Sequence, residues 1–540
     1  MTRRKSVAPT VLGMSVSPHE ISEPPPPDTR DVTQPMRFAG SAGLVSVIVV
    51  ASAAIVVYVT TALQRIGYPY ELQFFEGSTV EVSARVTEGL PLYGPPTTDF
   101  TPWPYPPLYF WVTGQLAHLT GINLPTLRAV SFVASLVSLL LIVLVVRRVT
   151  RSAVAGLVAA GLFAGTYRVT GAWFDAARVD SLLVMLLLAA ILVALHARTW
   201  RGGVALGSIL FLAFLTKQNA LIVAVPILLW LLWIRRSVGV AAGVVLASTA
   251  IGSIVLGDIL TDGWYSPYVV TQLLGHGAVL VWLAEFWVVD LLLPFGIVLV
   301  GAAFWWWAPR TRDGRVSASA SHPPPGRAQR DVGVVVASVV GLWLAALAGR
   351  LHDGGYINVA IPAHVGMALL LGLLAAAMLQ SPGTTSRLLL GAASVLALQL
   401  VVMAAWHGDV VPSAADRTAG DRFVASLRDL PGAVLVPSHP YYLRLAGLPP
   451  HASAIAVDDL LASRPSRSRD ALTAQLPWSL DGVSAVLLDA AADARLFGPA
   501  LTRDFTLVTS SAVPGEVFVP PTDVATKPSL LYVRTTELTP

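Results

Sequence analysis

Residues 129–148 read AVSFVASLVSLLLIVLVVRR, and this stretch decides the class of the protein. Positions 129–146 carry no charge, and Arg147 and Arg148 follow at once. A helix needs about 20 mostly apolar residues to cross a bilayer, and arginine collects at the cytoplasmic end of such helices. The stretch is therefore typical of a membrane-spanning helix that ends inside the cell.

The rest of the chain has the same character. Hydrophobic residues make up 54% and charged residues 13% of the 540 positions, and the mean hydropathy is +0.66. Soluble proteins carry about 25% charged residues. We therefore predict an all-α polytopic membrane bundle of about eleven spans, within a range of ten to thirteen. The apolar runs are 38–63, 129–146, 152–170, 179–197, 203–216, 220–234, 237–258, 286–308, 332–349, 361–380 and 387–405, and 108–119 is a candidate interfacial or re-entrant helix.

We expect the protein to lie in the plasma (inner) membrane, and the distribution of its charged residues predicts its orientation there. Residues 1–37 are polar, hold Arg3, Arg4 and Lys5 and include the proline run 24–27, which predicts a disordered cytoplasmic tail. With that tail inside, arginines fall in the inner connections: Arg147, Arg148, Arg151, Arg198, Arg201, Arg235, Arg236, Arg310, Arg312, Arg315, Arg327, Arg330 and Arg387. Acids fall in the outer connections: Glu71, Glu76, Glu81, Glu88, Asp99, Asp175, Asp180, Asp258, Asp262, Glu285, Asp290 and Asp353.

The composition changes after residue 405. Residues 406–540 hold 11 Lys or Arg and 14 Asp or Glu, and they include short apolar segments at 433–436 and 485–488. We expect a soluble α/β domain here, and eleven spans from an inside start place it outside the cytoplasm. The catalytic part would then be the membrane region 38–405.

The chain lacks cysteine and a continuous basic patch, and both features exclude classes of function. The chain has no cysteine, which excludes disulfides, thiol nucleophiles and cysteine-ligated metals. The net charge of +4 is spread over short loops and forms no continuous basic patch, so we expect no nucleic-acid partner.

The first outer loop, 64–128, is the longest in the membrane region, and such loops are usually functional. Glu71 and Glu76 lie near its start, and an ionisable group near hydrocarbon marks a candidate site. Trp103 and Tyr105 follow in an aromatic and proline-rich run that suits a sugar or lipid interface. The alternative for these two rings is an aromatic belt that anchors the loop in headgroups.

The second and third outer connections are short and charged. Asp175 and Arg178 are spaced to pair on one helix face, with Asp180 on another side. Their alternative role is stabilisation of a helix start. The third connection is Thr216-Lys217-Gln218-Asn219, in which an outward lysine is a candidate phosphate ligand. A simple flanking charge is the alternative.

The fifth outer connection indicates an anion-binding loop. Arg350, His352, Tyr356 and Asn358 surround the pair Gly354-Gly355, which lets a ligand approach the backbone closely. For His352 the alternative is a structural histidine. Carboxylates and cations would thus meet in one outer cavity. This suits transfer of a sugar from a lipid phosphate, because cations stabilise the leaving phosphate and a carboxylate deprotonates the acceptor.

These loops resemble the GT-C glycosyltransferases, in the branch of the protein O-mannosyltransferases and the lipid A aminoarabinose transferases. The likeness covers residues 40–405. It rests on Glu76-Gly77, Glu88-Gly89-Leu90-Pro91-Leu92-Tyr93, Tyr105-Pro106-Pro107-Leu108, Phe174-Asp175-Ala176-Ala177-Arg178-Val179-Asp180-Ser181, Thr216-Lys217-Gln218-Asn219 and Gly354-Gly355-Tyr356-Ile357-Asn358.

The resemblance implies an inverting enzyme that moves a sugar from a polyprenyl phosphate to a glycan, lipid or protein acceptor on the outer face. Glu76 corresponds to the family's loop-one acid, the expected general base, with Glu71 as its rival. Asp175 and Asp180 would form a second acidic cluster. Phosphate would be held by Lys217, Arg350 and His352, and Arg178, Gln218, Asn219, Tyr356, Asn358, Trp103 and Tyr105 would complete the substrate site.

The resemblance also bears on cofactors and on other functions. We expect no obligatory metal, with Mg²⁺ or Mn²⁺ held through water by facing carboxylates as the alternative. A transporter or flippase is the rival function, although its coupling sites would lie nearer the bilayer midplane. A scaffold whose C-terminal domain binds cell-wall components is the third.

Overall fold

The computed structural model describes residues 33–307, 326–381, 384–406, 408–522 and 524–537. Most of the predicted tail, 1–32, and the predicted inner arginines Arg310, Arg312 and Arg315 lie outside these residues. The first helix, α1 (Thr33–Ile66), begins five positions before the first predicted apolar run.

Within the described residues, seven helical segments are long and apolar enough to cross a membrane. Six of them lie in α1, α4 (Leu124–Thr150), α9 (Arg236–Leu260), α13 (Arg327–Leu351), α14 (Ile361–Gln380) and α15 (Ser386–Ala404). The seventh joins α11 (Trp282–Glu285), η2 (Phe286–Leu292), η3 (Leu293–Phe295) and α12 (Gly296–Trp307).

Four shorter apolar helices complete the bundle: α5 (Ala153–Val169), α6 (Asp180–His196), α7 (Trp200–Thr216) and α8 (Ala220–Ile234). These segments and the seven long ones lie at the eleven predicted positions, and the predicted helical membrane bundle is confirmed. How many of them cross the membrane stays a prediction.

The ends of α4 show how local sequence sets a helix. The side chain of Asn123 accepts a hydrogen bond from the Thr126 amide, and Pro125 lies in the first turn, where its missing N–H costs nothing. At the other end Arg151 adopts a left-handed conformation (φ 61°) that stops the helix.

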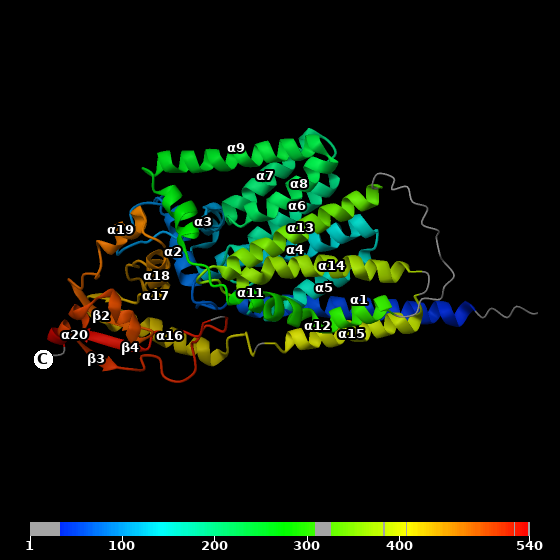
Figure 1. The fold of residues 1–540 in the computed structure, drawn as a ribbon. Coiled ribbons are helices and arrows are strands. Elements are labelled where there is room, and N and C mark those ends of the chain that lie inside the picture. The colour runs from blue at the N-terminus through cyan, green and yellow to red at the C-terminus, as the bar shows by residue number, and fades with distance from the viewer. Residues whose placement is uncertain (1–32, 308–325, 382–383, 407, 523, 538–540) are drawn as a thin grey trace, which may run out of the picture.

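Arginines from three predicted inner connections meet at one buried carboxylate. Arg235 lies 2.6 Å from Asp331 of α13, and Arg148 and Arg198 lie within 3.3 and 3.6 Å. The contacts tie α4, α13 and the ends of α6 and α8 together at the end of the bundle opposite the C-terminal domain (Figure 1).

The first outer loop is mostly ordered secondary structure. It contains α2 (Glu76–Thr87), which we did not predict, and α3 (Leu108–Thr120), which confirms a helix at 108–119. Further short elements in the outer connections are η1 (Pro267–Gln272), α10 (Leu273–Gly275) and η4 (Ile357–Ala360).

The C-terminal part is the predicted α/β domain. Its four-stranded sheet has the order β1-β2-β4-β3, with β1 parallel to β2 and the other pairs antiparallel. The predicted segments became β1 (Ala433–Leu435) and β2 (Val483–Leu488), followed by β3 (Phe505–Thr509) and β4 (Leu530–Arg534). The helices are α16 (Ala414–Asp429), α17 (Tyr441–Ala446), α18 (Ala454–Ala462), α19 (Arg467–Thr473), η5 (Ala491–Leu496), α20 (Pro499–Asp504) and η6 (Thr535–Glu537).

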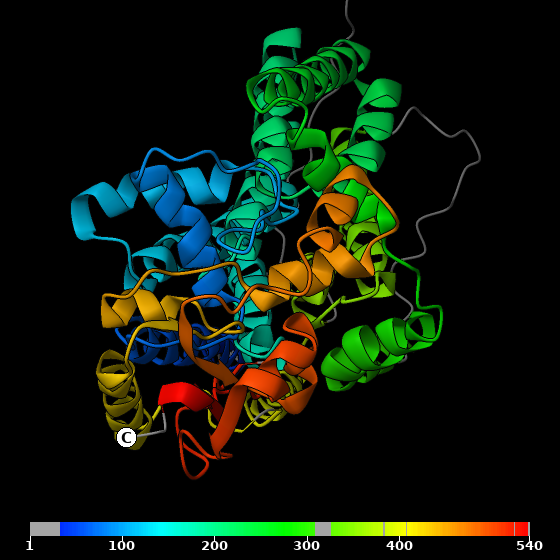
Figure 2. The same ribbon diagram turned by 90° about the vertical axis from the view of Figure 1, so that its left-hand side faces the viewer.

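This domain packs directly on the first outer loop, at the left end of the bundle in Figure 1 and facing the viewer in Figure 2. Tyr70 lies against Phe518 with ring centroids 5.1 Å apart, and the Leu72 carbonyl accepts a hydrogen bond from the Thr522 amide at 3.0 Å. Apolar residues of both parts form one buried cluster. Loop and domain therefore make a single layer over the ends of the helices.

Candidate active site

A cavity of about 550 Å³ lies between this layer and the helix ends. Nine of the ten residues that the sequence assigned to substrate binding line it: Trp103, Tyr105, Arg178, Lys217, Gln218, Asn219, His352, Tyr356 and Asn358. They come from four connections far apart in the sequence, so the fold brings the predicted set together.

Arg178 stands in an aromatic corner of this cavity. Its guanidinium carbon lies 4.7 Å from the Phe75 ring centre and 5.6 Å from that of Tyr105, and Nη2 donates to the Tyr105 hydroxyl at 3.3 Å. The side chain is 5% exposed, and its Nε–H is buried without a hydrogen-bond partner in the described structure. A buried donor without a partner is costly, so this N–H is available to a ligand.

Lys217 lies on the same tyrosine. Its ammonium group is 5.6 Å from the Tyr105 ring centre and 2.8 Å from Asp180 Oδ1, while Asn358 donates to Asp180 Oδ2 at 3.1 Å. Burial alone would lower the pKa of Lys217, but Asp180 raises it, so the lysine stays charged. Asp180 cancels this charge, which leaves Arg178 as the uncompensated cation of the corner.

The neighbouring connections are fixed by their polar groups. Gln218 donates to the carbonyls of Pro104 and Val269 at 2.7 and 2.8 Å, which ties the third connection to the first outer loop. Arg350 does not line the cavity. It binds Asp290 at 2.8 Å and donates to the Gly355 carbonyl at 2.9 Å, so it braces the glycine loop from behind.

Glu76, the predicted base, is fully buried and lies outside the cavity lining. Arg128 Nε and the Ala177 amide donate to Oε1 at 2.9 and 2.7 Å, and Arg128 Nη2 and the Leu72 amide donate to Oε2 at 2.5 and 2.7 Å. Although burial raises it, Arg128 and these amides hold the pKa of Glu76 below its usual value. The carboxylate thus joins α2, α4 and the second outer connection.

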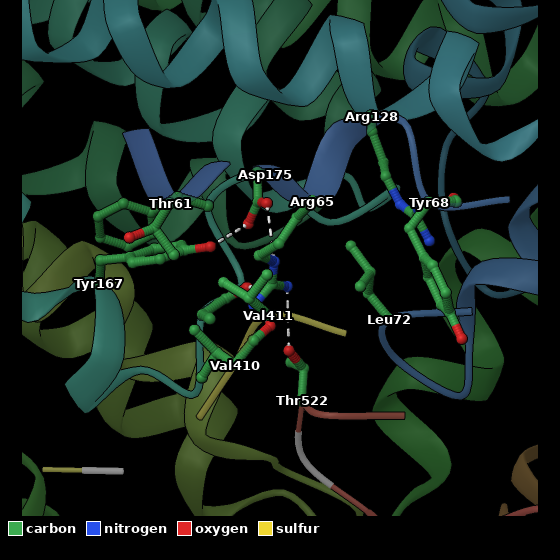
Figure 3. Close-up of polar contacts among 12 residues, drawn as sticks. Thr61, Arg65, Tyr68, Leu72, Arg128, Tyr167, Asp175, Val410, Val411 and Thr522 are labelled. Atoms are coloured by element: carbon green, nitrogen blue, oxygen red, sulfur yellow. Dashed lines mark hydrogen bonds and ion pairs between the residues drawn. The ribbon is translucent and has the colours of Figure 1, made fainter. Parts of the chain in front are cut away.

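Asp175 is also buried away from the cavity, and its predicted pairing with Arg178 is wrong. Residues 174–179 form a run of bends, not the helix that this pairing requires. Asp175 binds Arg65 Nε at 3.0 Å and accepts from the Tyr167 hydroxyl at 2.8 Å (Figure 3). Arg65 in turn donates to the Val410 carbonyl, at 3.0 Å, so this pair also joins the bundle to the C-terminal part.

Glu71 points into the C-terminal domain. Its Oε2 is hydrogen-bonded to Nδ1 of His439, whose Nε2 lies 2.9 Å from Asp489 Oδ2. Burial opposes a charge on the ring, but Asp489 and Glu71 raise the pKa of His439 well above its ordinary value. All three side chains are buried or nearly so.

One part of the cavity lining was largely missed by sequence reasoning. Asp458 and Asp459 of α18 form it together with His276, Asp353 and His352. His276 Nε2 lies 3.0 Å from the Asp459 carbonyl, and the rings of His276 and His352 lie 4.3 Å apart. No local sequence pattern predicts a contact between α18 and residues more than 100 positions earlier.

The partners Arg65 and Arg128 were also missed, but the sequence carries a signal for them. Both lie at predicted outer ends of apolar runs, against the usual preference of arginine for the inner side. An arginine in that position needs a carboxylate, and each has one.

In the described residues no group of three or more His, Asp or Glu side chains is placed to hold a metal ion. Metal dependence therefore stays a prediction.

Comparisons with known proteins agree with this architecture. Residues 104–256 match a family model described as dolichyl-phosphate-mannose-protein mannosyltransferase. The crystal structure of ArnT from Cupriavidus metallidurans in the apo state has a TM-score of 0.56 at 13% identity, and the alignment covers 92% of this chain and 98% of that chain. The same protein bound to undecaprenyl phosphate gives 0.53 at 13% identity, with 90% and 97% covered. Among curated protein sequences none matches. The chain is thus a multi-pass membrane protein with the fold of the GT-C glycosyltransferases, the superfamily that its loop motifs resemble.

Proposed function

We propose that this protein is an inverting membrane glycosyltransferase that moves a sugar from a polyprenyl phosphate to a glycan, lipid or protein acceptor on the outer face of the plasma membrane. The observation that carries the proposal is the pair of cations, Arg178 and Lys217, each 5.6 Å from the centre of the Tyr105 ring in the cavity lining. A phosphodiester placed there would accept from the free Nε–H of Arg178.

Two similarities support a polyprenyl phosphate donor. The protein of similar fold was crystallised with undecaprenyl phosphate, and the matching family model is described by a dolichyl phosphate sugar. The aromatic rings around Arg178 suit the sugar itself, since their faces pack against C–H groups while the cation stays with the phosphate.

The reaction breaks the bond between the anomeric carbon and the phosphate oxygen. An acceptor oxygen attacks that carbon from the opposite side, its proton passes to a base, and the phosphate leaves with both bonding electrons. Arg178 and Lys217 stabilise the charge that develops on the phosphate.

We propose that Glu76 positions the site and that the base is one of the three described carboxylates that line the cavity. Four donors occupy both oxygens of Glu76, so no lone pair is free to take a proton. Asp353, Asp458 and Asp459 instead face the space that an acceptor would enter. We further propose that no metal is obligatory. EDTA should then leave the rate unchanged, and loss of activity that Mg²⁺ or Mn²⁺ restores would contradict this.

The test is donor consumption by the purified protein in nanodiscs. Polyprenyl-phosphate mannose comes first, followed by other polyprenyl-phosphate sugars, with release of polyprenyl phosphate as the readout. Arg178→Ala should abolish release, whereas the exposed His118→Ala on α3 should not change it. If every donor stays intact but lipid-linked sugar crosses sealed vesicles, the protein is a flippase and the proposal fails.

A further inference from the structure

Three buried ionisable side chains have no part in the reaction described above. Glu71 belongs to the first outer loop, whereas His439 and Asp489 belong to the C-terminal domain. One oxygen of each carboxylate, Glu71 Oε1 and Asp489 Oδ1, is buried without a hydrogen-bond partner in the described structure. Burying a polar atom without a hydrogen-bond partner costs free energy, so we expect these side chains to have a function.

The ring of His439 is the link between the two parts. Both of its nitrogens face carboxyl oxygens, which only accept in the ionised form; with Glu71 and Asp489 ionised both nitrogens donate, and a ring that donates twice is the charged imidazolium. The ring also stacks on Tyr442, with centroids 5.3 Å apart and planes 16° from parallel. The surrounding titratable groups are Tyr442 on the ring with Tyr68 beside it, Glu76 and Arg128 beyond Glu71, Asp493 beside Asp489, and Tyr441.

The position of Glu71 is transmitted to the cavity by close packing. A Cβ on Gly77 would lie 1.9 Å from Glu71 Oε1 and 2.9 Å from Tyr441 Cβ, so the first turn of α2 rests directly on this carboxylate. Between Glu71 and Gly77 lie Phe74 and Phe75, which line the cavity, and Phe75 supports the guanidinium of Arg178 at 4.7 Å.

We propose that His439 and Asp489 are positioning residues of the anion site: the imidazolium holds loop 70–77 against the C-terminal domain, and Phe75 thereby holds Arg178 in place. The inference rests on the proposed function, because it assumes that Arg178 binds the phosphate of the donor. Under this proposal the C-terminal domain helps to fix the geometry of the anion site.

The chain offers a matched rescue. Ser78 of α2 donates to Ser453, at the start of α18, with oxygens 2.6 Å apart, and the chain has no cysteine of its own. Ser78→Cys and Ser453→Cys together would place two thiols where the two hydroxyls now touch, so that oxidation can join them. The disulfide would tether the same loop to the same domain without any imidazolium.

The experiment uses the full chain with undecaprenyl phosphate as the probe. His439→Ala should weaken its binding at least tenfold and speed amide exchange in residues 70–77, and the oxidised disulfide should restore both to within about twofold. Wild-type affinity should fall at alkaline pH, and the cross-linked chain should lose this dependence. The exposed His118→Ala is the control.

The inference would be overturned if His439→Ala bound undecaprenyl phosphate as tightly as the wild type does between pH 6 and 9. A loss of affinity that the disulfide does not restore would also overturn it. Amide exchange is measured without ligand, so it tests the tether even if undecaprenyl phosphate does not bind. Absence of binding by the wild type would count against the proposed function, whereas normal exchange in His439→Ala would count against the positioning role.

Discussion

Replacing Glu76 by glutamine separates a positioning carboxylate from a catalytic base. The substitution removes the negative charge and replaces one acceptor oxygen by an NH₂ group. This group is a donor and would face the N–H donors that now bind the carboxylate. Arg128, which is fully buried, then keeps its charge without a charged partner, with only the Tyr68 and Tyr70 carbonyls and a neutral amide to accept from it. Breaking a buried ion pair from one side costs about 3–5 kcal/mol, a large part of the roughly 5–15 kcal/mol that holds a domain folded.

We therefore expect Glu76→Gln to lower the free energy of unfolding by about 3–5 kcal/mol. The assay is unfolding of the purified protein in one detergent at one pH, with the transfer rate corrected for the folded fraction. Glu88→Gln is the control, since Glu88 pairs with Arg444 at 3.0 Å but is half-exposed, and it should cost less than about 1 kcal/mol.

A double variant sharpens the test. Glu76→Gln with Arg128→Met removes both charges, so it should be more stable than Glu76→Gln alone. A Glu76→Gln protein that is as stable as the wild type but transfers no sugar would refute this reasoning and return the role of base to Glu76.

Three further outcomes follow from the described contacts. Arg178→Lys should weaken polyprenyl phosphate binding about tenfold or more, because lysine lacks the planar fork and the ring contacts, and a titration of binding checks this. Gly77→Ala should destabilise by about 1–3 kcal/mol in thermal unfolding, since its Cβ meets Glu71, whereas Gly252→Ala in α9, with nothing within 4 Å, should be neutral or stabilising. Folding raises the pKa of His439, so the stabilisation by its charged ring is complete below the pKa of the unfolded state and is lost as pH rises through the pKa of the folded state. The free energy of unfolding of the wild type should therefore fall at alkaline pH, and that fall should be absent in His439→Gln.

The helices were predictable because hydropathy is a local property. Each apolar run became a helix at its predicted place, and caps such as Asn123 can be read from neighbouring residues. The convergence of the residues that the sequence assigned to substrate binding was predictable for a related reason: in a bundle with short connections, polar side chains at the same ends of neighbouring helices converge.

The partners of these residues were not predictable in the same way. The sequence predicted Glu76 as the base in the outer cavity, whereas Arg128, 52 positions later, pairs with it and contacts both of its oxygens. The wall formed by Asp458 and Asp459 depends on how a separate domain docks, which no pattern within either part encodes. Pairing and docking are long-range, so they decide which acids stay free to react.

The docking of α18 also constrains the order in which the protein is made. When residue 405 leaves the ribosome, the apolar helices have all been synthesised, but Asp458, Asp459 and His439 have not. In the predicted orientation the last quarter of the chain must still be exported before Asp458 and Asp459 can line the cavity. A chain stalled at this stage would carry Arg178 and Lys217 without Asp458, Asp459 and the contact between His439 and Glu71, so the cavity would be complete only after export.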